Sequence, residues 1–143
     1  MDVENSVFIA VKDLLSSRLE IMPWHDFDLE PGYDDVRGEL EVLCRQKADS
    51  EFLTKVLRAE FLHDAKQVYI TNIFMPETMT HERLGKRVIK AMYEASAKHD
   101  YHLLLVDMVP SFYRRMLEHG ALRIDGDSVQ ILAKTNLLYD LPK

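Results

Sequence analysis

Three basic residues, Arg83, Lys86 and Arg87, lie where a loop leads into an amphipathic helix, directly after an apolar, strand-like stretch. The segment over residues 73–85 has the sequence IFMPETMTHERLG. The first N–H groups of a helix have no acceptor within the helix, and the helix dipole is positive at that end. A helix that starts just after a strand directs these donors at the space above the sheet edge. We therefore predict a site for an anion such as a pyrophosphate.

The elements expected to position these cations alternate between strand and helix. Residues 67–75 (QVYITNIFM) are rich in β-branched and aromatic residues, which favours a strand, and Pro76 ends its ladder. Residues 80–98 repeat apolar side chains at helical spacing on one face. Residues 102–108 contain a continuous Leu-Leu-Leu-Val, which is typical of a strand covered on both faces.

A short helix and a hairpin are expected to close the chain. Pro110 suits the first turn of a helix, and Gly120 suits its C-terminal stop. Residues 121–124 and 129–132 flank Asp-Gly-Asp, a typical hairpin turn. Helices between strands predict an α/β (α+β) domain with a sheet covered by helices.

The first half of the chain gives weaker patterns. Apolar residues at helical spacing predict a first helix over about 6–18. Residues 19–37 contain breakers and many acidic residues, so we expect mostly loop. Residues 39–45 alternate polar and apolar, as a half-buried strand does. Residues 48–64 match both a helix and a strand, and we prefer the helix.

Composition limits the class of protein. The chain has 143 residues, 47% of them hydrophobic, which suits one domain over residues 1–143. A formal net charge of -6 and a sequence pI near 5.5 argue against a nucleic-acid partner. The single cysteine, Cys44, allows no internal disulfide, as expected of a cytoplasmic protein. The sequence has no apolar run long enough to span a membrane and no cationic signal-peptide start.

Two short motifs resemble the acyl-CoA-binding segment of the GNAT (Gcn5-related N-acetyltransferase) superfamily. Residues 74–77 (FMPE) and 84–89 (LGKRVI) are similar to the two ends of its pattern V-x-P-E-x-R-G-x-G-x-G-K-x-L. The resemblance covers mainly residues 67–132, where the element order also agrees. It implies a GNAT-like mixed central sheet covered by helices, with a divergent N-terminal half. Residues 108–127 also resemble, more weakly, the acyl-homoserine-lactone synthases.

The resemblance implies a function. It suggests transfer of an acyl group from acetyl-CoA, or another acyl-CoA, to a small-molecule or protein amine by direct attack in a ternary complex. Backbone near Ile73 and Phe74 would pair with the pantetheine arm, and an N–H there would polarise the thioester carbonyl. The implied cofactor-binding residues are Ile73, Phe74, Met75, Arg83, Leu84, Gly85, Lys86 and Arg87.

Acyl transfer to an ammonium group needs a base, and the leaving thiolate takes up a proton. Glu77 and Asp107, near the ends of predicted strands, are the candidate bases. The family's usual acid is a tyrosine about four residues before a glycine; here Met116 has that spacing, and Tyr113 lies about one turn away. Tyr113 is therefore the candidate acid.

A different class of function stays open. Gly85 is the one glycine in a loop where the family has several, so the chain could be a catalytically inactive GNAT-like fold that binds a protein. Trp24 and Phe27 stand in the acidic 19–37 segment and suit such a partner surface. A homodimer through a sheet edge is also left open. The spacing of His25, Asp26 and Asp28 matches no recognised set of metal ligands, so no metal is expected.

Overall fold

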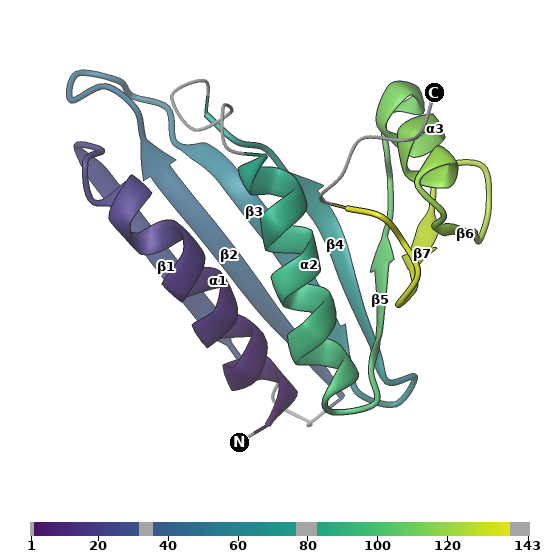
Figure 1. Ribbon diagram of the computed structural model, residues 1–143. Helices are drawn as coiled ribbons and strands as arrows, with labels where there is room; N and C mark the ends of the chain where they lie inside the picture. The colour runs from purple at the N-terminus through teal and green to yellow at the C-terminus, as the bar shows by residue number, and fades with distance from the viewer. Residues whose placement is uncertain (1, 32–35, 77–82, 138–143) are drawn as a thin grey trace.

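The computed structural model describes residues 2–31, 36–76 and 83–137 of the chain. Their helices and strands run in the order shown in Figure 1: α1 (Val3–Leu19), β1 (Trp24–Glu30), β2 (Arg37–Arg45), β3 (Thr54–Leu62), β4 (Gln67–Ile73), α2 (Leu84–Ala97), β5 (His102–Leu105), α3 (Pro110–Glu118), β6 (Leu122–Arg123) and β7 (Val129–Ile131).

One seven-stranded sheet runs through the described part of the chain, in the order β1-β2-β3-β4-β5-β7-β6. Its neighbouring strands are antiparallel except β4 and β5, which are parallel. Helices α1 and α2 lie side by side on one face of this sheet, while α3 lies beyond β5 near β6 and β7 (Figure 1). The expected mixed sheet with helical cover is confirmed in this coarse form.

The core lies between the sheet and the pair α1 and α2. The strand expected over 39–45 is confirmed as β2, whose alternate residues Leu40, Val42 and Cys44 are fully buried. Helix α2 packs its apolar stripe on the same core, with Leu84, Val88 and Met92 buried as the helical spacing predicts. Burial of this many aliphatic side chains supplies most of the drive for folding.

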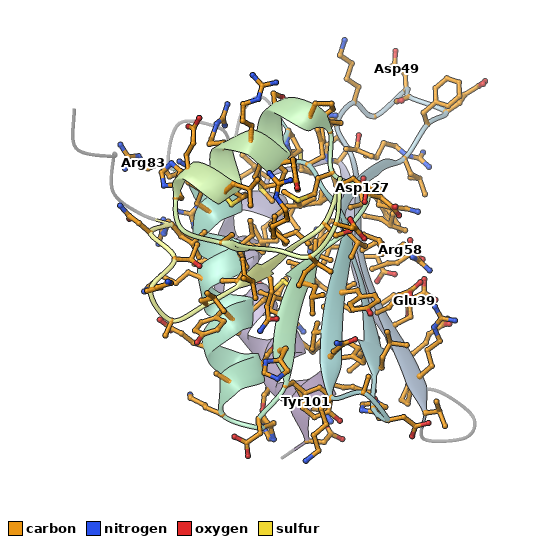
Figure 2. All side chains as sticks on the ribbon, turned by 90° about the vertical axis from the view of Figure 1, so that its right-hand side faces the viewer. Glu39, Asp49, Arg58, Arg83, Tyr101 and Asp127 are labelled. Carbon is orange, nitrogen blue, oxygen red and sulfur yellow. The ribbon has the colours of Figure 1, made fainter. Side chains whose placement is uncertain are left out.

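The opposite face of the sheet is polar. Glu39 of β2 and Arg58 of β3 point away from the helices, as Figure 2 shows. Arg58 forms ion pairs with Glu39 at 2.7 Å and with Glu60 at 2.9 Å, and Arg37 pairs with Glu60 at 2.6 Å. Strands β2 and β3 therefore alternate between an apolar face toward the helices and an ion-paired face toward solvent.

The helix preferred for residues 48–64 is wrong, because β3 forms there instead. Phe52, which the helical pattern would bury, is 80% exposed and lies in the loop before the strand. β3 pairs with β2 on one side and with β4 on the other. Hydrogen bonds to a strand on each side therefore outweighed a local periodicity that fitted both structures.

The loop expected over residues 19–37 is also wrong in its middle, where β1 forms. Phe27 and Leu29 pack against the core, while the intervening positions carry acidic side chains. Aspartate is disfavoured in strands, which is why the composition suggested a loop. Pairing of all seven β1 residues with β2 overrides that preference.

The remaining expected elements are present with small changes of boundary. The first helix is longer than predicted because the Asp2 carboxylate accepts the Asn5 N–H at 2.9 Å and caps it. The helix expected over 80–98 is described from Leu84, since residues 80–82 lie outside the described ranges. The short helix ends before Gly120, whose φ of 96° is the left-handed value expected at a helix stop.

Candidate functional site

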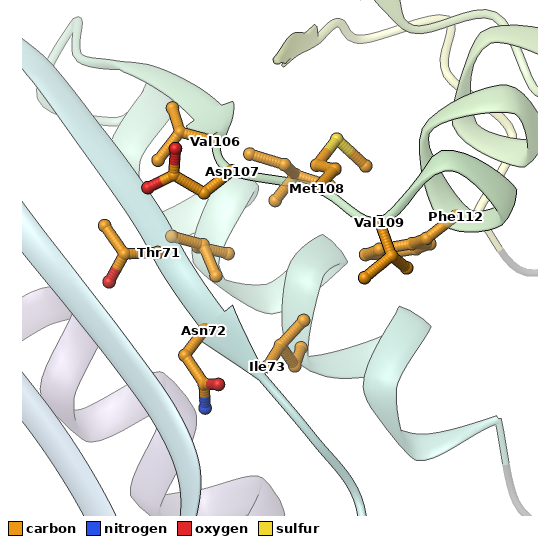
Figure 3. A pocket seen from close by; sticks show the side chains of 10 residues that line it. Thr71, Asn72, Ile73, Val106, Asp107, Met108, Val109 and Phe112 are labelled. Atoms are coloured by element: carbon orange, nitrogen blue, oxygen red, sulfur yellow. The ribbon is translucent and has the colours of Figure 1, made fainter. Parts of the chain in front are cut away.

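The parallel strands β4 and β5 separate near the end of the sheet. Their paired register ends at Ile70 and Leu105, and the Val106 N–H donates to the Ile70 carbonyl at 3.1 Å. Beyond that bond, β4 continues beside β3 to Ile73, whereas the chain after β5 turns away toward α3. Figure 3 shows the resulting gap, with β4 on one side and the 106–112 segment on the other.

A β-bulge sets the direction of the β4 backbone at this gap. Ala59 of β3 pairs with Ile70 and Arg58 pairs with Asn72, so Thr71 is the extra residue. The Phe74 N–H donates to the Val56 carbonyl at 2.8 Å on the β3 side. Neighbouring pairs of an antiparallel ladder alternate between bonded and non-bonded, so the N–H and C=O of Ile73 point away from β3, toward the gap.

A small cavity of about 150 Å³ occupies the gap (Figure 3). Its lining combines apolar side chains with a few polar groups, and comprises Ile70, Thr71, Asn72, Ile73, Leu105, Val106, Asp107, Met108, Val109 and Phe112. The only carboxylate among these described residues is Asp107, which is exposed and has a φ of 54°. A non-glycine residue in this left-handed conformation costs free energy and is enriched at functional sites.

A larger cavity of about 470 Å³ lies at the N-terminus of α2. Its described lining residues are Ile73, Met75, Arg83, Leu84, Gly85, Lys86, Ile89, Val109, Phe112 and Arg115. Ile73, Val109 and Phe112 line both cavities. The two spaces are therefore neighbours that share these apolar residues in their linings.

The described lining of the larger cavity is positively charged. Arg83, Lys86 and Arg115 line it, and none of its described lining residues is acidic. The Arg87 N–H, bonded to the Arg83 carbonyl at 3.0 Å, makes the first bond of the α2 ladder, so the three amides before it have no acceptor within the helix. Arg83, at the N-cap with a φ of 53°, makes no side-chain cap. Cations and helix amides together suit a bound anion.

The structure brings most of the predicted cofactor-binding residues together at this cavity. Ile73, Met75 and the run of Arg83, Leu84, Gly85 and Lys86 line it. Arg87 does not, and Phe74 is half-exposed with its amide bonded to β3. The candidate base Glu77 lies outside the described residues.

Tyr113, the candidate acid, is directed elsewhere. Its hydroxyl donates to the Asp125 carbonyl at 2.6 Å, and its ring lies 5.8 Å from the Arg123 guanidinium. Tyr113 lines neither cavity, whereas Asp107 lines the smaller one. The structure therefore does not bring Tyr113 and Asp107 to one place.

Sequence reasoning missed the contribution of α3. Phe112 and Arg115 both line the larger cavity. Their i, i+3 spacing places them on one face of a helix, and this spacing in the sequence indicates that the two side chains can act at one surface. Nothing local, however, indicates that this face turns back toward the start of α2.

A second polar cluster lies at the N-terminal end of α1. Glu4 is nearly buried and pairs with the His63 imidazole, whose Nδ1 lies 2.7 Å from the Tyr101 hydroxyl. Burial raises the pKa of Tyr101, and the charge of Glu4 adds to the effect. The cluster joins α1, the β3–β4 turn and the residue before β5, so its role is to hold these elements together.

In comparisons with known proteins, no family model matches the chain and no curated protein matches it significantly. The described ranges contain no group of three His, Cys, Asp or Glu side chains arranged to hold a metal ion. Within the same ranges, no helix has the length and apolar character needed to cross a membrane. The chemistry of the site therefore follows from its own residues.

Proposed function

We propose that the protein is an acyl-CoA-dependent N-acyltransferase with a GNAT-like fold, most simply transferring acetyl from acetyl-CoA to an amine. The observation that supports this most is the pair of adjoining cavities where β4 and β5 separate. One is cationic and the other is mainly apolar with one carboxylate. A ligand with an anionic end and a neutral thioester end suits that combination.

The diphosphate of CoA would bind in the larger cavity. Arg83 and Lys86 approach it from α2 and Arg115 from α3, so three positive charges surround the space. The amides at the start of α2 add donors that need no side chain. Charge-assisted hydrogen bonds of this kind are about twice as strong as neutral ones.

The thioester would lie beside Ile73. Its main-chain groups face the gap, so the pantetheine arm can take the place of the missing strand and the Ile73 N–H can donate to the thioester oxygen. Such a fixed donor stabilises the negative charge that develops there during attack. The acyl group would then occupy the smaller cavity.

Asp107 is the residue placed to accept a proton from the incoming ammonium group, because its carboxylate stands at the smaller cavity. The free amine then forms a C–N bond to the acyl carbon while the C–S bond breaks, and the nitrogen releases its second proton to solvent to give the amide. CoA departs as a thiolate and takes a proton from solvent. Direct attack in a ternary complex therefore uses Ile73 and Asp107, with no acid from Tyr113.

Titration calorimetry with acetyl-CoA and with CoA tests the binding half of this proposal. We expect saturable heat for both ligands and a rise in melting temperature at millimolar ligand. Absence of both effects would remove the enzymatic function. Release of free thiol from acetyl-CoA in the presence of a panel of amines then tests catalysis and identifies the acceptor class.

A second candidate is a catalytically inactive GNAT-like fold that binds a protein. The observation favouring it is the engagement of the Tyr113 hydroxyl by the Asp125 carbonyl, since the tyrosine is then unavailable as an acid. The two candidates differ in one measurement. The binding module would show no heat with either CoA ligand while remaining folded.

A further inference from the structure

Strand β1 is an edge of the sheet, paired with β2 on one side only among the described residues. Along its free side, alternate residues of this seven-residue strand present main-chain donors and acceptors that a further strand could use. Phe27 and Leu29 pack partly against the core on the helix face, where the Phe27 ring lies 6.4 Å from that of Phe8. Alternation then places Asp26, Asp28 and Glu30 on the opposite face.

The register between β1 and β2 sets like charges against each other. Asp28 is opposite Glu41, and Glu30 is opposite Glu39. Carboxylates directly opposite in a sheet repel, so this arrangement destabilises the isolated sheet.

The nearby cations pair with the β2 carboxylates and not with those of β1. Lys55 pairs with Glu41 at 3.3 Å, and Arg58 pairs with Glu39 at 2.7 Å, so both bind the β2 carboxylates. Asp26, Asp28 and Glu30 make no ion pair with any residue in the described ranges. One face of this edge therefore presents uncompensated negative charge at every second residue.

We infer that the β1 edge binds an extended segment of a partner protein as an added strand, and that this segment carries Lys or Arg at every second position. Main-chain hydrogen bonds along β1 would hold it, as in other cases of strand addition. Its basic side chains would lie beside Asp26, Asp28 and Glu30. The residues between them would lie beside the partly buried Phe27 and Leu29.

A second copy of this chain is the wrong occupant on charge grounds. Two β1 strands paired antiparallel would place their acidic faces on the same side of the joined sheet. The acidic residues of one copy, Asp26, Asp28 and Glu30, would then lie opposite those of the other and repel them. Charged side chains on an edge strand commonly prevent self-association in this way. The surface therefore selects a basic strand over an acidic one.

Fluorescence anisotropy with two labelled hexapeptides of identical composition tests the periodicity. One alternates, Lys-Val-Lys-Val-Lys-Val, and the other is blocked, Lys-Lys-Lys-Val-Val-Val. We expect the alternating peptide to bind about tenfold more tightly, because only it aligns each charge with a carboxylate along the strand. Equal affinities would overturn the inference, since they would indicate attraction by net charge alone. No binding of either peptide at millimolar concentration would overturn it as well.

A charge-matched pair of variants tests the location. The triple variant Asp26→Asn, Asp28→Asn, Glu30→Gln should lose about tenfold in affinity for the alternating peptide, the combined effect of three modest exposed ion pairs. The control Asp13→Asn, Asp49→Asn, Glu51→Gln removes the same charge from exposed positions elsewhere and should change affinity by less than about twofold. Equal losses in both variants would contradict a site on β1.

Amide hydrogen exchange distinguishes binding of the peptide as an added strand from binding through side-chain contacts alone. We expect the alternating peptide to slow exchange at alternate amides of residues 24–30, since those N–H groups gain acceptors. Binding without this protection would overturn the added strand.

Sedimentation tests whether a second copy occupies the edge. Self-association that is lost in the triple variant would identify a second copy as the occupant. None of these binding experiments uses CoA, so their results do not depend on the proposed acyltransferase activity.

Discussion

The Val106 N–H and the Ile70 carbonyl, 3.1 Å apart, form the bond at which the β4–β5 ladder ends. Past this point the two strands separate, and the bulge at Thr71 leaves the Ile73 main chain facing the gap. The site therefore depends on two main-chain features and requires no glycine-rich loop at Ile73.

Arg115→Met should weaken CoA binding about tenfold, equivalent to ~1.4 kcal/mol, because one cation of the larger cavity is lost while an unbranched apolar stem is kept. Titration calorimetry gives the affinity. The matched control is Arg114→Met, which removes the neighbouring exposed charge outside the cavity. If both variants bind CoA equally well, Arg115 makes no contact with the ligand.

Gly85→Ala should stabilise the fold and weaken CoA binding at the same time. A Cβ at Gly85 would meet the Met75 Cγ at 3.6 Å, an ordinary contact, and replacing glycine in a helix gains up to ~1 kcal/mol. The added methyl also lies at the cavity wall and should reduce CoA affinity by about threefold or more. The control is Gly126→Ala, where a Cβ would have no neighbour within 4 Å, and CoA affinity should not change. Unchanged CoA affinity in Gly85→Ala would place the phosphates away from α2.

Tyr113→Phe should lower the free energy of unfolding by about 1 kcal/mol, because its hydroxyl bond to the Asp125 carbonyl is lost. Acyl transfer should be unaffected. Asp107→Asn should instead lower kcat/KM about a hundredfold while leaving CoA affinity unchanged, as expected for loss of a general base. A large loss of kcat in Tyr113→Phe with normal stability would restore the tyrosine as the acid.

Gly38→Ala should destabilise the fold by about 1–3 kcal/mol through overpacking. A Cβ at Gly38 would lie 2.8–3.0 Å from the Glu4 carboxylate, which pairs with His63. The clash should nearly disappear in a Glu4→Ala background, since truncation removes the atoms in conflict. Urea unfolding of the four proteins in this double-mutant cycle measures the coupling. Equal costs in both backgrounds would show that Glu4 is not the obstacle.

Glu60 should make the fold sensitive to acid. Burial alone would raise the pKa of Glu60, but hydrogen bonds from Arg37 and Arg58, with their positive charges, lower it below the ordinary value. Because the folded-state pKa is the lower one, the stabilisation is complete above about pH 4.3 and is lost as the pH falls through the folded pKa. Glu60→Gln should therefore show a shallower fall of unfolding free energy between about pH 5 and pH 2.

Urea unfolding at a series of pH values measures that slope. The control Glu51→Gln removes an exposed carboxylate and should follow the wild-type curve. A Glu60→Gln curve parallel to wild type would show that this ion-paired carboxylate does not contribute to acid unfolding.

Elements with one strong local pattern were predictable from the sequence. The helical stripe of α2, the alternation of β2 and the apolar run of β5 each match one structure only, and burial follows the pattern in all three. Cations at the start of a helix after a strand likewise predicted the positively charged lining of the larger cavity. Each of these inferences needs only the spacing of apolar residues within one segment and the identity of the residues that flank it.

Tertiary structure decided everything that depends on partners outside the segment itself. β3 and β1 form because the strands next to them in the chain satisfy their main chains, against a helical pattern in one case and a loop-like composition in the other. Arg115 reaches the cavity only because α3 and the start of α2 line the same space. The direction of the Ile73 amide depends on a one-residue bulge, and side-chain identity does not encode such a register shift because the hydrogen bonds that fix it join two strands.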